Sequence, residues 1–124
     1  MSDLCQKLQN VSEAGVYRLN CPLSDLRKST ADSGYNLLEV NLAEARGKGE
    51  VLAEMARVIE APDWFGHNWD ALADALADLS WKAAPGYVLV LHGDTAGEEA
   101  LTEILEATAA FWKSQGKPFW VFFA

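Results

Sequence analysis

The sequence has few of the features that mark secreted, membrane-spanning or metal-binding proteins. It contains only two cysteines, Cys5 and Cys21, which form neither a CxxC pair nor a zinc-ligand pattern. No apolar run approaches the roughly 18 residues of a membrane-spanning helix. Residues 1–9 also lack the apolar core of a signal peptide. We therefore expect a cytoplasmic protein with reduced thiols, no structural metal and no membrane association.

Basic residues are also scarce. Ten lysines and arginines stand against 18 aspartates and glutamates, which gives a net charge of −8. Nucleic acids and anionic membranes bind proteins through a basic footprint, so direct binding to either is not expected. The glycines form no phosphate-binding GxGxxG or GxxxxGK[ST] motif, and we predict no cofactor and no small-molecule substrate. The charge balance permits a basic protein partner instead.

Half of the residues are hydrophobic, and their spacing predicts alternating strands and helices. Strands are expected at 15–19, 35–42, 87–91 and 119–123, and helices at 22–33, 50–59, 68–79 and 101–116. This β-α-β-α-α-β-α-β order is typical of an α/β protein with a mainly parallel sheet of three to four strands packed with helices. We expect one domain over residues 1–124.

The stretch 62–76 differs from its surroundings. Asn68 occupies the position of a helix N-cap, and Gly66 is expected to allow the backbone turn that leads into the helix. Apolar residues then recur at i, i+3, i+4 and i+7, which predicts a core-facing stripe of Leu72, Ala75, Leu76 and Leu79.

Asp70, Asp74 and Asp78 follow one another at intervals of four on the opposite side of this helix. Stacked like charges repel one another by a few tenths of a kcal/mol per pair. A solvated acidic face is the ordinary interpretation of such a triplet. Two observations favour a protein-binding surface instead: ten acidic residues and only one basic residue lie between positions 58 and 112, and three large aromatic side chains lie nearby, Trp64, Trp69 and Trp81.

The segment 64–74, Trp-Phe-Gly-His-Asn-Trp-Asp-Ala-Leu-Ala-Asp, resembles the barstar family of intracellular ribonuclease inhibitors. The shared pattern is two aromatic residues, Gly, any residue, Asn, an apolar residue, Asp-Ala-Leu and a second Asp. The resemblance extends loosely over residues 35–124, while residues 1–34 are similar to an added strand–helix unit. It implies a barstar-like fold and a non-enzymatic inhibitor whose acidic helix and aromatic loop occlude the basic active site of a ribonuclease or nuclease-type toxin.

By this resemblance, Trp64 replaces a contact tyrosine of the family, Gly66 and Asn68 shape the loop, and Asp70 and Asp74 contact the enzyme's cationic side chains. The family prototype has tryptophan where this chain has Ala73. The predicted partner-binding residues are Trp64, Phe65, Gly66, His67, Asn68, Trp69, Asp70, Ala73, Asp74 and Trp81.

Two alternatives remain open. An acidic adaptor or a toxin-immunity protein for a different basic partner would need the same surface. A metal-dependent hydrolase could use His67, Asp70 and Asp74, although no second histidine or cysteine lies close by in the sequence. On the last helix, Phe111 and Trp112 are expected to belong to the core.

Overall fold

A computed structural model describes residues 7–63, 65–93 and 99–124. Its regular elements follow the predicted order. They are the 3₁₀ turn η2 (Val11–Glu13), β1 (Val16–Arg18), α1 (Leu23–Ser33), β2 (Asn36–Asn41), α2 (Gly47–Ile59), α3 (Trp69–Asp78), the 3₁₀ turn η3 (Ser80–Lys82), β3 (Tyr87–His92), α4 (Glu99–Ser114) and β4 (Phe119–Phe123).

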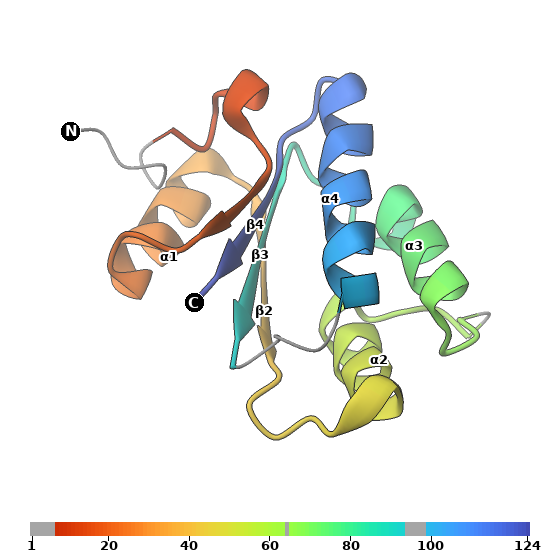
Figure 1. Ribbon diagram of the computed structural model, residues 1–124. Helices are drawn as coiled ribbons and strands as arrows, with labels where there is room; N and C mark the ends of the chain where they lie inside the picture. Colours follow the sequence, from red (N-terminus) through yellow and green to blue (C-terminus); the bar gives the residue numbers. More distant parts are fainter. Residues whose placement is uncertain (1–6, 64, 94–98) are drawn as a thin grey trace.

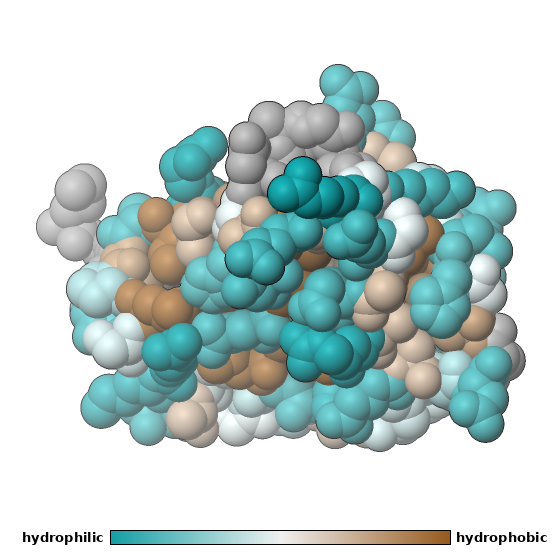
Figure 2. Space-filling model, turned by 90° about the horizontal axis from the view of Figure 1, so that it is seen from below, coloured by the Kyte–Doolittle hydropathy of each residue, from teal (hydrophilic) through white to brown (hydrophobic). Residues whose placement is uncertain are grey.

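The strands form one four-stranded sheet in the order β1-β4-β3-β2, and every neighbouring pair is parallel. Leu38 of β2 lies opposite Leu89 of β3, which lies opposite Val121 of β4. The predicted α/β class is therefore confirmed. All strands end at the lower edge of the sheet in Figure 1, and the molecule seen from that side presents mainly hydrophilic side chains with apolar patches between them (Figure 2).

Both faces of the sheet are covered, and the alternation along the strands assigns side chains to each face. Helices α2, α3 and α4 lie on one side of the sheet and α1 lies on the other (Figure 1). Leu89 and Leu91 of β3 belong to the larger core under α2–α4, whereas Val88 and Val90 belong to the smaller core beneath α1. The five residues from Tyr87 to Leu91 are all buried, as their continuous apolar run predicts for a parallel strand covered on both faces.

The chain before residue 35 supplies the second layer. Leu26 of α1 is fully buried, and the indole N–H of Trp120 on β4 donates to the Leu8 carbonyl at 2.9 Å. The guanidinium of Arg27 donates twice to the carboxylate of Glu39 on β2, at 2.9 Å each. These hydrogen bonds hold the pKa of Glu39 below its usual range. Apolar packing, a hydrogen bond and an ion pair thus hold this layer against the sheet.

Helix α2 begins three residues earlier than the sequence predicts. Gly47 adopts a φ of 78° and is the first residue of the helix. A positive φ is sterically accessible to glycine, so the chain turns into the helix there without a side-chain cap on Arg46. This early start lengthens α2 at its amino end.

One observation bears on the compartment expected from the sequence. Cys21 is disulfide-bonded, which contradicts the expectation of reduced thiols; the other cysteine, Cys5, lies outside the described residues. Cysteine spacing could not decide this point because oxidation requires only that two thiols meet in space. Within the described ranges, no helix combines the length and apolar character needed to cross a bilayer.

We predict that Leu26→Ala lowers the stability of the whole protein by about 2–5 kcal/mol, because it leaves a cavity in the layer beneath the sheet. Urea unfolding followed by both far-UV circular dichroism and tryptophan fluorescence measures this change. The exposed neighbour Ser24→Ala serves as the control and should leave stability nearly unchanged. Two separate transitions, with only one of them shifted by Leu26→Ala, would contradict the expectation of a single domain.

Candidate functional site

Helix α3 is the outermost element on its side of the sheet (Figure 1), where it packs against α4 and α2. It buries Leu72, Ala75 and Leu76 completely. The indole N–H of Trp112 on α4 donates to the Leu76 carbonyl at 2.8 Å, which joins the two helices. The predicted core stripe of this helix is therefore confirmed, and the helix is fixed to the body of the protein by packing and a hydrogen bond.

The predicted N-cap of this helix is confirmed. The side-chain oxygen of Asn68 accepts a hydrogen bond from the backbone N–H of Ala71 at 2.7 Å. Its amide nitrogen donates to the Gly66 carbonyl at 3.2 Å, so one side chain ties the loop to the first turn. The cap satisfies a helical N–H group that has no partner within the helix.

The backbone turn into the helix lies one residue later than expected. His67, not Gly66, adopts a left-handed conformation, with a φ of 45°. At Gly66, a Cβ atom would lie 3.2 Å from the amide nitrogen of Asn68, so a larger residue there would force that side chain to shift by a few tenths of an ångström. The His67 ring contacts the buried ring of Phe65 edge-on, with 5.0 Å between the ring centroids. Phe65 thus anchors the loop to the core, and His67 stands exposed above it.

The acidic stripe, which consists of Asp70, Asp74 and Asp78, is fully on the exposed side of α3. None of the ion pairs in the described part of the chain involves these three carboxylates. The repulsion between successive aspartates is therefore not offset by a nearby cation. Asp70, in the first turn, gains some stabilisation from the helix dipole, whereas Asp78 lies in the last turn, where the dipole is unfavourable.

The other predicted partner-binding residues divide between surface and core. Trp69 and Ala73 are half-buried, and Trp69 packs against the larger core. Trp81 is also half-buried, and its indole N–H donates to the Ile59 carbonyl at the end of α2 at 2.8 Å. It follows α3 in the chain and so lies at the end of that helix opposite the loop. Trp64 lies outside the described residues.

The structure gives no support to the metal-dependent alternative. His67, Asp70 and Asp74 are all described, yet no three histidine, cysteine, aspartate or glutamate side chains within the described ranges are grouped so as to hold a metal ion. Position 67 belongs to the left-handed loop rather than to the helix, which removes the helical spacing that the alternative assumed.

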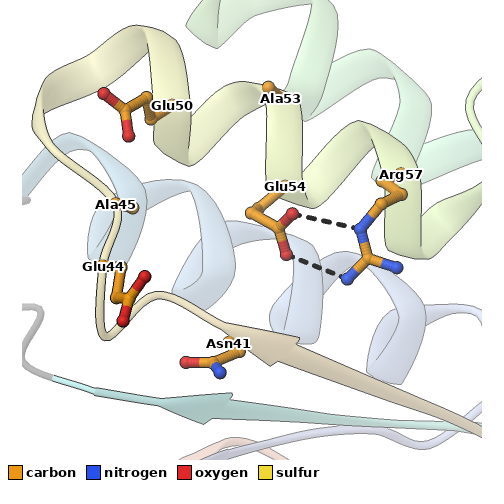
Figure 3. Close-up of a pocket in the computed structure, with 7 residues that line it drawn as sticks. All are labelled: Asn41, Glu44, Ala45, Glu50, Ala53, Glu54 and Arg57. Atoms are coloured by element: carbon orange, nitrogen blue, oxygen red, sulfur yellow. Dashed lines mark hydrogen bonds and ion pairs between the residues drawn. The ribbon is translucent and has the colours of Figure 1, made fainter.

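An open groove of about 480 Å³ lies elsewhere, between α2 and the end of β2 (Figure 3). Glu44, Glu50 and Glu54 contribute carboxylates, and Arg57 is the one basic residue of its lining. The Arg57 guanidinium donates to both oxygens of Glu54, at 3.0 and 2.9 Å, so the two charges offset each other. The groove lies apart from the segment that the sequence singles out.

The sequence model of one family, Barstar (barnase inhibitor), matches residues 35–124, nearly three quarters of the chain. The chain belongs to the barstar family. The matched range contains three of the four strands, all of α2, α3 and α4, and the whole of the capped loop and the acidic stripe. Proteins of the barstar family are inhibitors rather than enzymes. No curated protein matches this chain.

One surface feature of this barstar-family protein differs from the sequence expectation. Trp112 is half-buried against the larger core as predicted, but its neighbour Phe111 is 41 % exposed. The spacing of apolar residues in α4 is a sequence signal for the exposure of Phe111. Ala100, Ile104, Ala107 and Phe111 form a second apolar row beside the buried row that contains Leu101, Leu105 and Trp112. The apolar side of α4 is therefore wider than the area that the core covers.

We predict that Asn68→Ala destabilises the protein by about 0.5–2 kcal/mol, because it removes the N-cap of α3. Asn68→Asp is the matched control, since its carboxylate retains the acceptor and favours the positive end of the helix dipole. Thermal melting of the two variants beside the natural protein measures the difference. Equal melting temperatures for Asn68→Ala and the natural protein would show that the loop does not depend on the cap.

Proposed function

We propose that this protein inhibits a basic ribonuclease, or a nuclease-type toxin, by placing α3 and the loop before it over the enzyme's active site. The observation that carries the proposal is the exposed acidic stripe, which has no ion-pair partner among the described residues and lies inside the range matched by the family. Partner charges would relieve the repulsion that the free protein retains.

Ribonuclease active sites bind the phosphates of RNA, so they carry arginine and lysine side chains. A carboxylate resembles a phosphate to an arginine because both accept paired hydrogen bonds from its planar fork. Asp70 and Asp74, one turn apart on α3, present two such acceptors from one rigid element. Together they would occupy positions that RNA phosphates take in the uninhibited enzyme.

The surface is also held in place before binding. The Asn68 side chain fixes the loop, Phe65 anchors it in the core, and the Trp112 hydrogen bond fixes α3 on α4. A surface that is already ordered loses less conformational entropy when it associates, which favours tight binding. Ala73 is half-buried and lies next to Asp74 in the chain, and we expect a side chain of the partner to contact it.

The first prediction of this proposal separates a binding surface from a solvated acidic face. Asp74→Ala should weaken inhibition at least about thirtyfold, or about 2 kcal/mol of binding free energy, because it leaves a desolvated cation of the enzyme without a partner. That magnitude is the general one for truncated interfacial charges, of which the barnase–barstar pair is itself a reference case. Calorimetric titration against a panel of basic ribonucleases that begins with barnase measures the affinities.

Asp25→Ala on α1 is the matched control, since Asp25 is exposed, has the same charge and lies outside the matched range. It should leave the affinity unchanged. Thermal melting should show that Asp74→Ala is as stable as the natural protein or slightly more so, because alanine favours the helix and repulsion is relieved. Equal affinities for both variants would remove the acidic stripe from the interface.

A second prediction concerns the rate of association. Complementary charges accelerate encounter, and salt shortens the reach of these charges to about 8 Å at 0.15 M. We expect the association rate with the inhibited ribonuclease to fall steeply as the salt concentration rises, and to fall less steeply for Asp74→Ala. Stopped-flow fluorescence measures both. Rates that are independent of salt would exclude electrostatic attraction as the source of binding.

A further inference from the structure

The segment before β1, residues 7–14, has little regular structure of its own. Its regular element is the short 3₁₀ turn η2. The backbone N–H groups of Asn10, Glu13 and Ala14 donate to carbonyls within the same segment, so these hydrogen bonds do not attach it to the sheet. A segment of this kind opens at low free-energy cost unless other contacts hold it. Its position therefore depends on the contacts that it makes with the rest of the protein.

Leu8 makes the contact that attaches this segment to the sheet. Its side chain is 1 % exposed and belongs to the smaller core, and its carbonyl accepts the hydrogen bond from the Trp120 indole at 2.9 Å. The Trp120 ring is stacked on Phe122 of the same core, with the ring centroids 5.8 Å apart. If the segment left this position, the core would lose a buried leucine and the buried indole N–H would lose its acceptor.

A covalent bond adds to this contact. Cys21 is disulfide-bonded, and it packs half-buried against the smaller core that contains Leu8. The sequence contains no third cysteine, so within one chain the bond can only join Cys21 to Cys5, which lies outside the described residues. A bond from position 5 to position 21 closes a loop that includes the whole of residues 7–14. Closing a loop covalently removes many of the open conformations of the chain inside it.

We propose that the Cys5–Cys21 disulfide is a reversible redox latch that keeps residues 7–14 closed over the smaller core. A dithiol reductant opens the latch. Its thiolate attacks one sulfur of the bond, and its second thiol resolves the mixed disulfide. Two electrons and two protons pass to the protein, so Cys5 and Cys21 become thiols while the reductant becomes a cyclic disulfide. Cys21 is only half-buried, which allows a thiolate to approach it, and exposed disulfides are the labile ones.

The rest of the protein is held by contacts that do not include this bond. The buried Leu26 and the paired hydrogen bonds from Arg27 to Glu39 attach α1 to the sheet. The range that matches the family, residues 35–124, supplies almost all of the larger core and the whole of α3. Reduction should therefore release residues 7–14 and leave α1 and α3 in place.

The first experiment identifies the bond in protein incubated with oxidised glutathione. Trypsin cleaves after lysine and arginine, so mass spectrometry without reductant should find peptide 1–7 linked to peptide 19–27. The intact protein should have the mass of one chain less two hydrogen atoms. A disulfide-linked dimer, or a chain that keeps both thiols free under these conditions, would overturn the proposal.

The second experiment measures hydrogen exchange of the oxidised protein and of the same protein in excess dithiothreitol. Backbone amides of residues 8–14 should exchange at least about tenfold faster after reduction, because the loop constraint is lost. The amides of α1 and α3 should be unchanged, and reoxidation with oxidised glutathione should restore the slow exchange. Cys5→Ser is the matched variant, since it removes the bond and leaves the half-buried Cys21 in place. It should exchange fast with or without the reductant.

Three results would overturn the latch. Equal exchange of residues 8–14 in the oxidised and reduced protein would show that Leu8 and its hydrogen bond hold the segment without the disulfide. Faster exchange in α1 and α3 as well would show that the bond stabilises the whole fold. A response of Cys5→Ser to dithiothreitol would show that the reductant acts elsewhere than on this bond.

Discussion

A parallel sheet exposes two apolar faces, and the whole architecture follows from covering both of them. The inner strands β3 and β4 are buried almost without interruption, so helices must pack on either side. Residues before position 35, with Leu8 and Leu26, cover one face, and α2 and α4 cover the other together with α3. Because α3 packs on two other helices, its opposite side faces solvent. That side carries the acidic stripe.

The fold therefore fixes the position of the acidic stripe, but the three aspartates do not stabilise the fold. Alanine at position 74 would favour the helix and relieve repulsion from Asp70 and Asp78. The natural aspartate therefore lowers the free energy of unfolding slightly. The surrounding contacts are strong enough to tolerate this: Asn68 caps the helix, and Leu72 and Leu76 bury its apolar side. A local loss of stability on a firmly fixed helix is what a surface shaped for a partner should show.

Much of this could be predicted from the sequence, because strand and helix periodicity and the N-cap at Asn68 are local properties. The features that were missed depend on three-dimensional context. His67 rather than Gly66 adopts the positive φ because the cap and the anchored Phe65 fix the loop around it. The width of an apolar row does not reveal how far the core extends beneath it, so the sequence predicts a core position for Phe111, whereas the ring is exposed. The disulfide at Cys21 depends on which thiols meet.

In the proposed complex, α3 and the loop before it contact the ribonuclease. Hydrogen exchange followed by mass spectrometry, on the natural protein alone and in complex with an inhibited ribonuclease, tests this most directly. We expect backbone amides from position 65 to the first turns of α3 to exchange more slowly in the complex, while those of α1 are unchanged. Slower exchange confined to α1 and the sheet edge at β2, with none at α3, would contradict it.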